Sequence, residues 1–170
     1  MSTLKVNAIK NLANQEPFGL TLMTQVTASG TAVDFTGIPS WAKRITIMFS
    51  NVSSSATSNY LIQIGSGSLT TTGYTSTSAS IGNAAVTSTA GFIATYVMVA
   101  ANSYAGSYTI LNVHPTLYVG SGTMVTSNAA NNAFISGGSV TLSGALDRVR
   151  ITTVNGTDTF DAGTINIMYE

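Results

Sequence analysis

The sequence predicts an all-β protein, an antiparallel β-sandwich of the jelly-roll type that follows a short N-terminal arm. Apolar and polar residues alternate over several segments, which is the period of a half-buried strand. The three-to-four-residue spacing of an amphipathic helix is nearly absent. Clusters of Gly, Ser and Asn separate the alternating segments, as turns do in sandwiches, and they predict about eight to ten strands.

Four segments carry the clearest alternation, and each is predicted to form a strand with one buried face. They are residues 44–50, 59–65, 147–154 and 164–170. Their inward side chains are predicted to be Ile45, Ile47 and Phe49, then Tyr60, Ile62 and Ile64, then Val149 and Ile151, and finally Ile165 and Ile167 with Tyr169. In the third segment, Arg148, Arg150 and Thr152 are predicted to face outward.

Weaker patterns predict the remaining strands and the connections between them. The pair Asn155-Gly156 predicts a tight turn, because both residue types tolerate a positive φ. Residues 70–89 are mostly Ser, Thr, Gly and Ala and are longer than a usual connection, so we expect a surface loop, either functional or a plain excursion. Further strands are expected at 20–26, 91–99, 107–114 and 133–136, with another short one around Val140 and Leu142.

The chain divides into an arm, residues 1–19, and a sandwich domain, residues 20–170. The beginning of the arm alternates only weakly, and the arm is too short to bury a core of its own. We expect it to dock on another chain or on the main domain through Leu4, Val6 and Ile9. The longest strongly apolar run, residues 92–101, is too short to cross a bilayer, so we expect no membrane insertion.

Charge is scarce and balanced. Six Lys and Arg offset six Asp and Glu, and charged residues make up 7% of the chain. Such a chain lacks the basic charge that phosphate binding needs, so we expect no nucleic-acid partner. Cysteine is absent, which excludes disulfides and thiolate chemistry. Residues 45–146 hold no Lys, Arg, Asp or Glu, and their one titratable histidine, His114, is read as a surface or interface residue.

Proton-transfer chemistry needs positioned titratable groups, so this distribution predicts a protein that is not an enzyme and uses no cofactor or metal. Three carboxylates, Asp147, Asp158 and Asp161, lie close in sequence, and two such acids held across a cleft could hydrolyse a glycoside. Turn and cap roles fit them better, with Asp147 paired to Arg148 or Arg44. Calcium binding by Asp158 and Asp161 stays open as an alternative.

Four aromatic residues are candidate ligand contacts. Trp41 precedes a predicted strand and either stacks on a sugar or covers the edge of the core. Tyr74, Tyr104 and Tyr108 lie in or beside Gly- and Ser-rich stretches. Exposed tyrosines on such loops suit recognition of carbohydrate or protein, because the ring buries area at low entropic cost. The alternative is that these rings pack on the sandwich or between protomers.

Several segments together resemble the distal domains of tailed-phage fibre and tail proteins. They are residues 34–53, 63–65, 71–74 and 148–170. Residues 2–9 resemble the N-terminus of fibre-like structural proteins of marine phages, especially cyanophages. The first set lies at both ends of the predicted domain and covers about a third of it.

The resemblance implies a virion structural protein with a trimeric β-sandwich domain. Here the arm leads into the domain with almost no stem, unlike a long fibre, so a short tail appendage and a capsid decoration protein both stay open. The expected partners are copies of the chain, other virion proteins and a host surface glycan. A stand-alone carbohydrate-binding module is the remaining alternative. Small side chains and few ions independently favour close packing of subunits, because little ion desolvation is needed.

Overall fold

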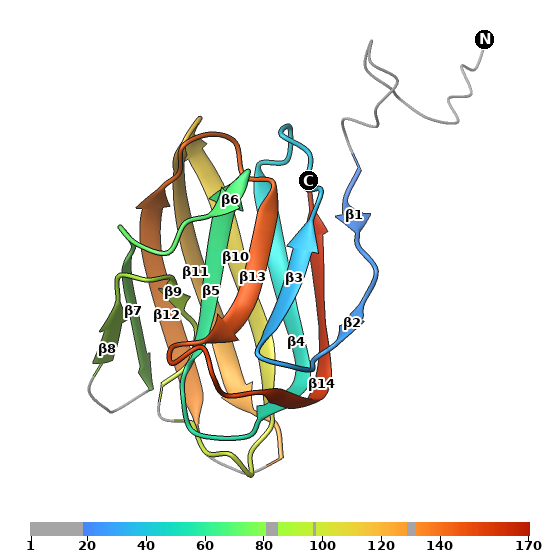
Figure 1. Ribbon diagram of the computed structural model, residues 1–170, viewed down its shortest axis with the longest axis vertical. Helices are drawn as coiled ribbons and strands as arrows, with labels where there is room; N and C mark the ends of the chain where they lie inside the picture. The colour runs from blue at the N-terminus through green and yellow to red at the C-terminus, as the bar shows by residue number, and fades with distance from the viewer. Residues whose placement is uncertain (1–18, 81–84, 97, 129–131) are drawn as a thin grey trace, which may run out of the picture.

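The structure is a computed structural model that describes residues 19–80, 85–96, 98–128 and 132–170 (Figure 1). Every regular element within these ranges is a β-strand. The strands are β1 (Thr21–Leu22), β2 (Val26–Thr27), β3 (Ala32–Thr36), β4 (Arg44–Ser54), β5 (Tyr60–Ser66), β6 (Ser68–Leu69), β7 (Thr75–Ser80), β8 (Ala85–Ser88), β9 (Phe92–Ile93), β10 (Tyr104–His114), β11 (Leu117–Thr126), β12 (Ala133–Thr141), β13 (Arg148–Thr153) and β14 (Phe160–Tyr169). In this part of the chain no helix is long and apolar enough to cross a membrane.

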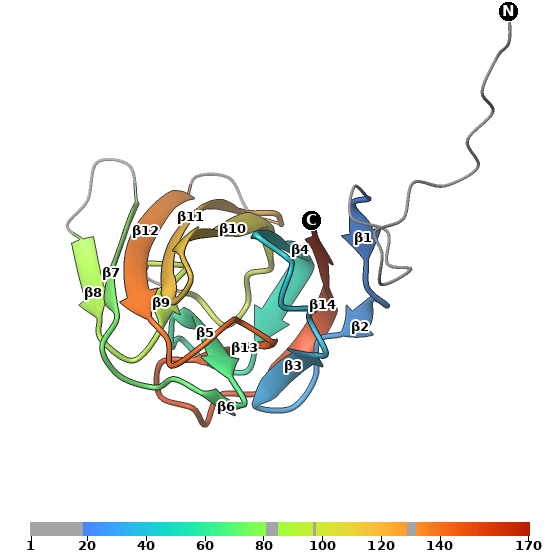
Figure 2. The ribbon, with the colours of Figure 1, turned by 90° about the horizontal axis from the view of Figure 1, so that it is seen from above.

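The strands form two antiparallel sheets that face each other, as the view from above shows (Figure 2). The large sheet has the order β1-β14-β4-β10-β11-β12-β7-β8, and β2 pairs with β14 beside β1. The small sheet has the order β3-β13-β5-β6, and β9 pairs with β5 on the same edge as β6, opposite β13. The predicted antiparallel β-sandwich is therefore confirmed, whereas the jelly-roll type stays a prediction.

The core lies between the two sheets and comes from the alternation read in the sequence. The four best predicted strands are confirmed as β4, β5, β13 and β14, and their predicted inward residues are buried except Tyr169, which is half-buried. In the small sheet, Val149 stands between Ile64 and Phe35, and Ile151 stands between Ile62 and Val33. Branched and aromatic side chains in such cross-strand rows are the main stabilising contacts of a sheet.

On the inner side of the large sheet, part of the core consists of one tyrosine ring that packs against two glycines. Tyr108 of β10 lies opposite Gly122 of β11, and its ring covers Gly120 and Gly122. A Cβ atom at Gly120 would stand 2.5 Å from Cε1 of the Tyr108 ring, and one at Gly122 would stand 2.5 Å from Cδ2. These glycines therefore make the space in which the buried ring lies.

The prediction of a surface loop over residues 70–89 is wrong in its larger part. This stretch contains β7 and β8, and β7 pairs with β12 to extend the large sheet. Ser76, Ser78 and Ser80 of β7 face inward and are buried. The Ser76 hydroxyl accepts a hydrogen bond from the Ile93 amide at 2.9 Å. Because the inward positions carry hydroxyls instead of apolar side chains, the strand leaves no hydrophobic alternation in the sequence.

Other boundaries also differ from the sequence-based expectations. Among the described residues of the predicted strand 91–99, only Phe92 and Ile93 form a strand, β9. Residues 20–26 give the first strand, β1, and the first residue of β2. The two short strands expected near 133–142 are one strand, β12, and the strand expected at 107–114 begins at Tyr104. Strands β3 and β11 were not predicted. The turn at Asn155-Gly156 is confirmed, with φ of 68° at Gly156.

The N-terminal arm lies almost wholly outside the described residues. Leu4, Val6 and Ile9, the predicted docking residues, are among those without a described position. From Thr21 onward the chain runs along the edge of the sandwich, where Thr21 pairs with Tyr169 and Val26 pairs with Ile165. The predicted arm therefore leads directly into the edge of the large sheet.

Candidate functional site

Tyr74 is part of the core, so the expectation of an exposed ring is wrong at this position. Its side chain is 2% exposed, and its ring meets Phe92 edge to face at a centroid distance of 5.0 Å. The Tyr74 hydroxyl accepts a hydrogen bond from the Ile64 amide at 2.8 Å and donates to the Thr70 carbonyl at 3.1 Å. Burial raises the pKa of Tyr74 to about 12. The residue thus ties the start of β7 to β5.

Tyr104 and Tyr108 are buried as well, as the packing alternative proposed. The Tyr104 hydroxyl accepts a hydrogen bond from the Val99 amide at 2.8 Å. The Tyr108 hydroxyl has no hydrogen-bond partner among the described residues, and burial raises the pKa of this group. Neither ring is available as an exposed platform. Gly106, which suggested a loop beside both tyrosines in the sequence, lies in β10, and Gly120 and Gly122 of β11 make room for the Tyr108 ring.

Trp41 takes the position of a cover at the edge of the core. It is half-buried and packs against the buried cluster. Its ring meets Tyr169 of β14 edge to face, with a centroid distance of 5.6 Å and an interplanar angle of 61°. This is the arrangement expected of the core-edge alternative, and it holds the entry to β4 against the end of the chain.

The carboxylates hold turns and ion pairs. Asp158 is buried and its Oδ2 accepts a hydrogen bond from the Ser58 amide at 3.0 Å. Asp161 is exposed and accepts a hydrogen bond from the Ser53 hydroxyl. These contacts match the predicted turn and cap roles. Among the residues that the structure places, there is no group of three or more His, Cys, Asp or Glu side chains that could hold a metal ion.

Asp147 pairs with Arg148, one of its two predicted partners, because Arg44 is engaged by Glu170. Arg148 Nε donates to Asp147 Oδ1 at 2.7 Å, and the Gly67 amide donates to Oδ2 at 3.0 Å. The hydrogen bonds from Arg148 are the main cause that lowers the pKa of Asp147.

The outer side of the large sheet forms a broad surface without charge, which we call the uncharged face. It consists of the outward residues of β10, β11, β12, β7 and β8 with the middle of β4, all drawn from residues 45–146. One cross-strand row runs from Thr123 through Ile135 to Ala79. Four large apolar side chains of these strands are exposed, Leu111 by 43%, Val113 by 60%, Val125 by 46% and Ile135 by 58%. Between them stand mostly Ser, Thr and Gly.

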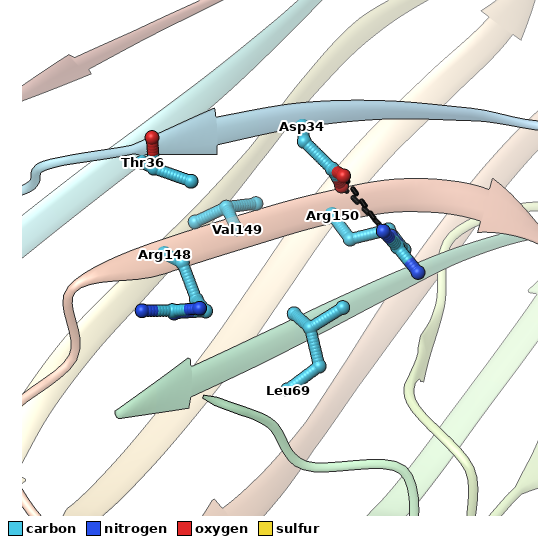
Figure 3. Close-up of a pocket in the computed structure, with 6 residues that line it drawn as sticks. All are labelled: Asp34, Thr36, Leu69, Arg148, Val149 and Arg150. Carbon is cyan, nitrogen blue, oxygen red and sulfur yellow. Dashed lines mark hydrogen bonds and ion pairs between the residues drawn. The ribbon is translucent and has the colours of Figure 1, made fainter. Parts of the chain in front are cut away.

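The outer side of the small sheet is chemically different, and we call it the charged face. It carries Asp34 of β3 with Arg148 and Arg150 of β13, and Asp147 stands just before β13. Arg150 donates from Nε to Asp34 Oδ1 and from Nη2 to Oδ2, both at 2.7 Å. Figure 3 shows this two-pronged contact bridging β3 and β13, with Leu69 lying between the two arginines.

Two hollows lie on the charged face, and both are lined by Arg150. The smaller, of about 80 Å³, lies between Asp34, Arg148 and Leu69 (Figure 3). The larger, of about 270 Å³, extends from Arg150 across Gln63 to the turn at Asn155. Arg150 was predicted to face outward, but Asp34, Gln63 and Arg150 were not predicted to be site residues. The run of outward polar residues along β13 is the signal that could have identified Arg150, whereas Asp34 and Gln63 lie on other strands.

No protein-family model, no curated protein and no solved structure matches this chain significantly. The chemistry of the two faces therefore has to be read from this molecule alone.

Proposed function

We propose that this chain is a non-enzymatic structural protein of a tailed-phage virion, a short tail-fibre or appendage component. In this proposal the protein assembles as a homotrimer through the uncharged face and is anchored to the particle by its N-terminal arm. The resemblance of residues 34–53 and 148–170 to distal fibre domains supports the virion assignment. The uncharged face is the observation that supports the proposed assembly into a homotrimer.

Physical chemistry supports assembly through this face. Burying ions against a partner is costly unless each is paired, and the outward residues of β10, β11 and β12 carry none. Leu111, Val125 and Ile135 would gain from removal of their exposed apolar surface from water. The small side chains around them permit the close backbone approach that a well-packed interface needs.

The anchoring role is tested by removing the arm. Particles produced with a chain lacking residues 2–17 should carry no copy of the protein, whereas the truncated chain should still fold, because the described sandwich begins after the deletion. Mass spectrometry of purified particles and circular dichroism of the isolated truncated chain are the two measurements. Particles that still contain the truncated protein would contradict the assignment of residues 1–19 as the anchor.

A capsid decoration protein is the second candidate, and the short path from arm to sandwich favours it. The first described strand, β1, already pairs with β14 of the large sheet, which leaves no long stem between arm and domain within this chain. Gold labelling of the protein on intact particles distinguishes the two locations. Label on the tail supports the appendage, label over the head supports decoration, and particles without label would contradict both.

A further inference from the structure

We propose that the charged face is a binding site for a neutral saccharide, which enters the larger hollow as a single pyranose ring beside Arg150. This inference rests on the proposed function, since it locates where an attached virion protein contacts a host surface glycan. It places the recognition surface on the outer side of β3, β13 and β5, and not at the buried residues Tyr74, Tyr104 and Tyr108. Three properties of the hollow carry the proposal.

The first property is that the polar groups are held in place before any ligand arrives. Asp34 fixes the Arg150 guanidinium through two hydrogen bonds of 2.7 Å. The Gln63 amide group donates from Nε2 to the Ala90 carbonyl at 3.0 Å, which fixes the plane of that side chain. The Thr152 hydroxyl donates to the Thr31 carbonyl at 2.8 Å. Side chains ordered in this way lose little entropy when a ligand binds.

The second property is that each of these groups keeps unused hydrogen-bonding capacity. With respect to the described residues, Arg150 Nη1 donates no hydrogen bond and Gln63 Oε1 accepts none. The Thr152 oxygen has used its proton and can still accept. A donor, an amide acceptor and a hydroxyl acceptor therefore line one hollow. Vicinal hydroxyls of a sugar act as donors and acceptors at once and match this set.

The third property is the balance of charge and size. Asp34 neutralises Arg150 and Asp147 neutralises Arg148, so the face has strong dipoles and no net charge. An anionic ligand would need an arginine without a partner carboxylate, which this face does not offer within the described residues. The hollow measures about 270 Å³, just below the range of pockets for drug-sized ligands, which fits one ring. Ala32 and Val154 add apolar lining against which the C–H face of a sugar can lie.

The test uses the full-length chain and saturation-transfer NMR with four neutral probes, the methyl pyranosides of glucose, galactose, mannose and N-acetylglucosamine. Methyl glucuronide and inorganic phosphate serve as anionic comparators. We expect saturation transfer to at least one neutral probe and a weaker signal, or none, for both anions. Binding of only an anion, or of none of the four neutral probes, would overturn the proposal.

Two substitutions locate the site. Gln63→Ala and Arg150→Ala should each weaken binding of the responding probe about tenfold, because each removes a hydrogen-bonding group. The matched control is Arg44→Ala, which breaks an exposed ion pair with Glu170 far from the hollow and should leave affinity unchanged. Equal affinity in wild type, Gln63→Ala and Arg150→Ala would place binding elsewhere and contradict the proposal.

The outcome is separable from that of the proposed function. A protein that is found in virions but binds no neutral pyranoside disproves the saccharide site alone. A protein that binds through Arg150 but is missing from virions disproves the virion role while leaving the site.

Discussion

The two outer faces of the sandwich share one core and differ in almost every other respect. The uncharged face spans several long strands and exposes Leu111, Val125 and Ile135 among hydroxyl and glycine residues. The charged face spans fewer strands and has two ion pairs and two hollows. This difference shows that the few charged residues of the protein are distributed unevenly between its two faces. The charged side chains gather on the outer side of the small sheet and are absent from the described outward positions of β10, β11, β12, β7 and β8.

The largest effect is expected from the inner side of the large sheet, where neighbouring glycines face opposite ways. A Cβ atom at Gly138 would overlap the Thr75 carbonyl of β7, whereas at Gly137 the nearest atom, the Gly120 carbonyl oxygen, would be 3.4 Å away. Gly138→Ala should therefore lower the free energy of unfolding by about 3 kcal/mol, and Gly137→Ala should change it by less than about 0.5 kcal/mol. Urea unfolding at one fixed protein concentration measures both, and equal losses would contradict the inward and outward assignment of β12.

A second, smaller effect is expected at the link between the two sheets. Tyr74→Phe leaves the Ile64 amide and the Thr70 carbonyl without their partner, so it should cost about 1–2 kcal/mol. Denaturant unfolding measures the loss, and an unchanged midpoint would show that Tyr74 does not tie β7 to β5.

The same residue predicts a response to alkaline pH. The pKa of Tyr74 in the folded state is about 12, above the ordinary value of 10.0, so folding favours the neutral phenol. Its contribution to stability is complete below pH 10 and is lost as pH rises toward 12. Absorbance titration of the phenolate should show a fraction of tyrosines ionising only near pH 12 or with unfolding. Complete ionisation near pH 10 with the fold intact would contradict the buried positions.

The smallest effect is expected from an ion pair on the charged face. Asp147→Asn should destabilise the protein at pH 7 by less than about 1 kcal/mol, because the pair is partly solvated. Arg148 lowers the pKa of Asp147, so this contribution is full above about pH 4 and disappears as pH falls through the lower folded value. Wild type and variant should therefore become equally stable once the pH lies below the lowered pKa of Asp147 in the folded state. A difference that persists at that pH would show that the side chain acts by packing and not by charge.

The strands that were predicted best are those whose alternation of apolar and polar residues can be recognised within the strand's own sequence. In β4, β13 and β14 the apolar residues recur at every second position, and this period needs no knowledge of the partner strand. Strand β7 escaped prediction because its buried positions are Ser76, Ser78 and Ser80, which look like loop residues until the strand pairs with β12. A hydrophobic pattern cannot reveal a strand whose inner face is polar.

The candidate site was harder to predict because it depends on contacts between distant residues. For Tyr108 the sequence left two alternatives, an exposed ring beside a Gly- and Ser-rich stretch or a ring packed on the sandwich. The glycines that matter, Gly120 and Gly122, lie on the neighbouring strand and receive its ring. Asp34 and Arg150 are 116 positions apart and meet only because β3 pairs with β13. The pairing register of β3 with β13 cannot be derived from residue types or from their spacing along the chain.

The measurement that most directly tests the account is the mass of the protein in solution at micromolar concentration by light scattering. The account predicts about three times 17.5 kDa for the wild type. Ile135→Lys, which places an ion in the middle of the uncharged face, should reduce the mass to 17.5 kDa. The matched change on the charged face, Thr36→Lys, should leave the trimer intact. A wild-type mass of 17.5 kDa, or loss of the trimer in Thr36→Lys but not in Ile135→Lys, would contradict the account.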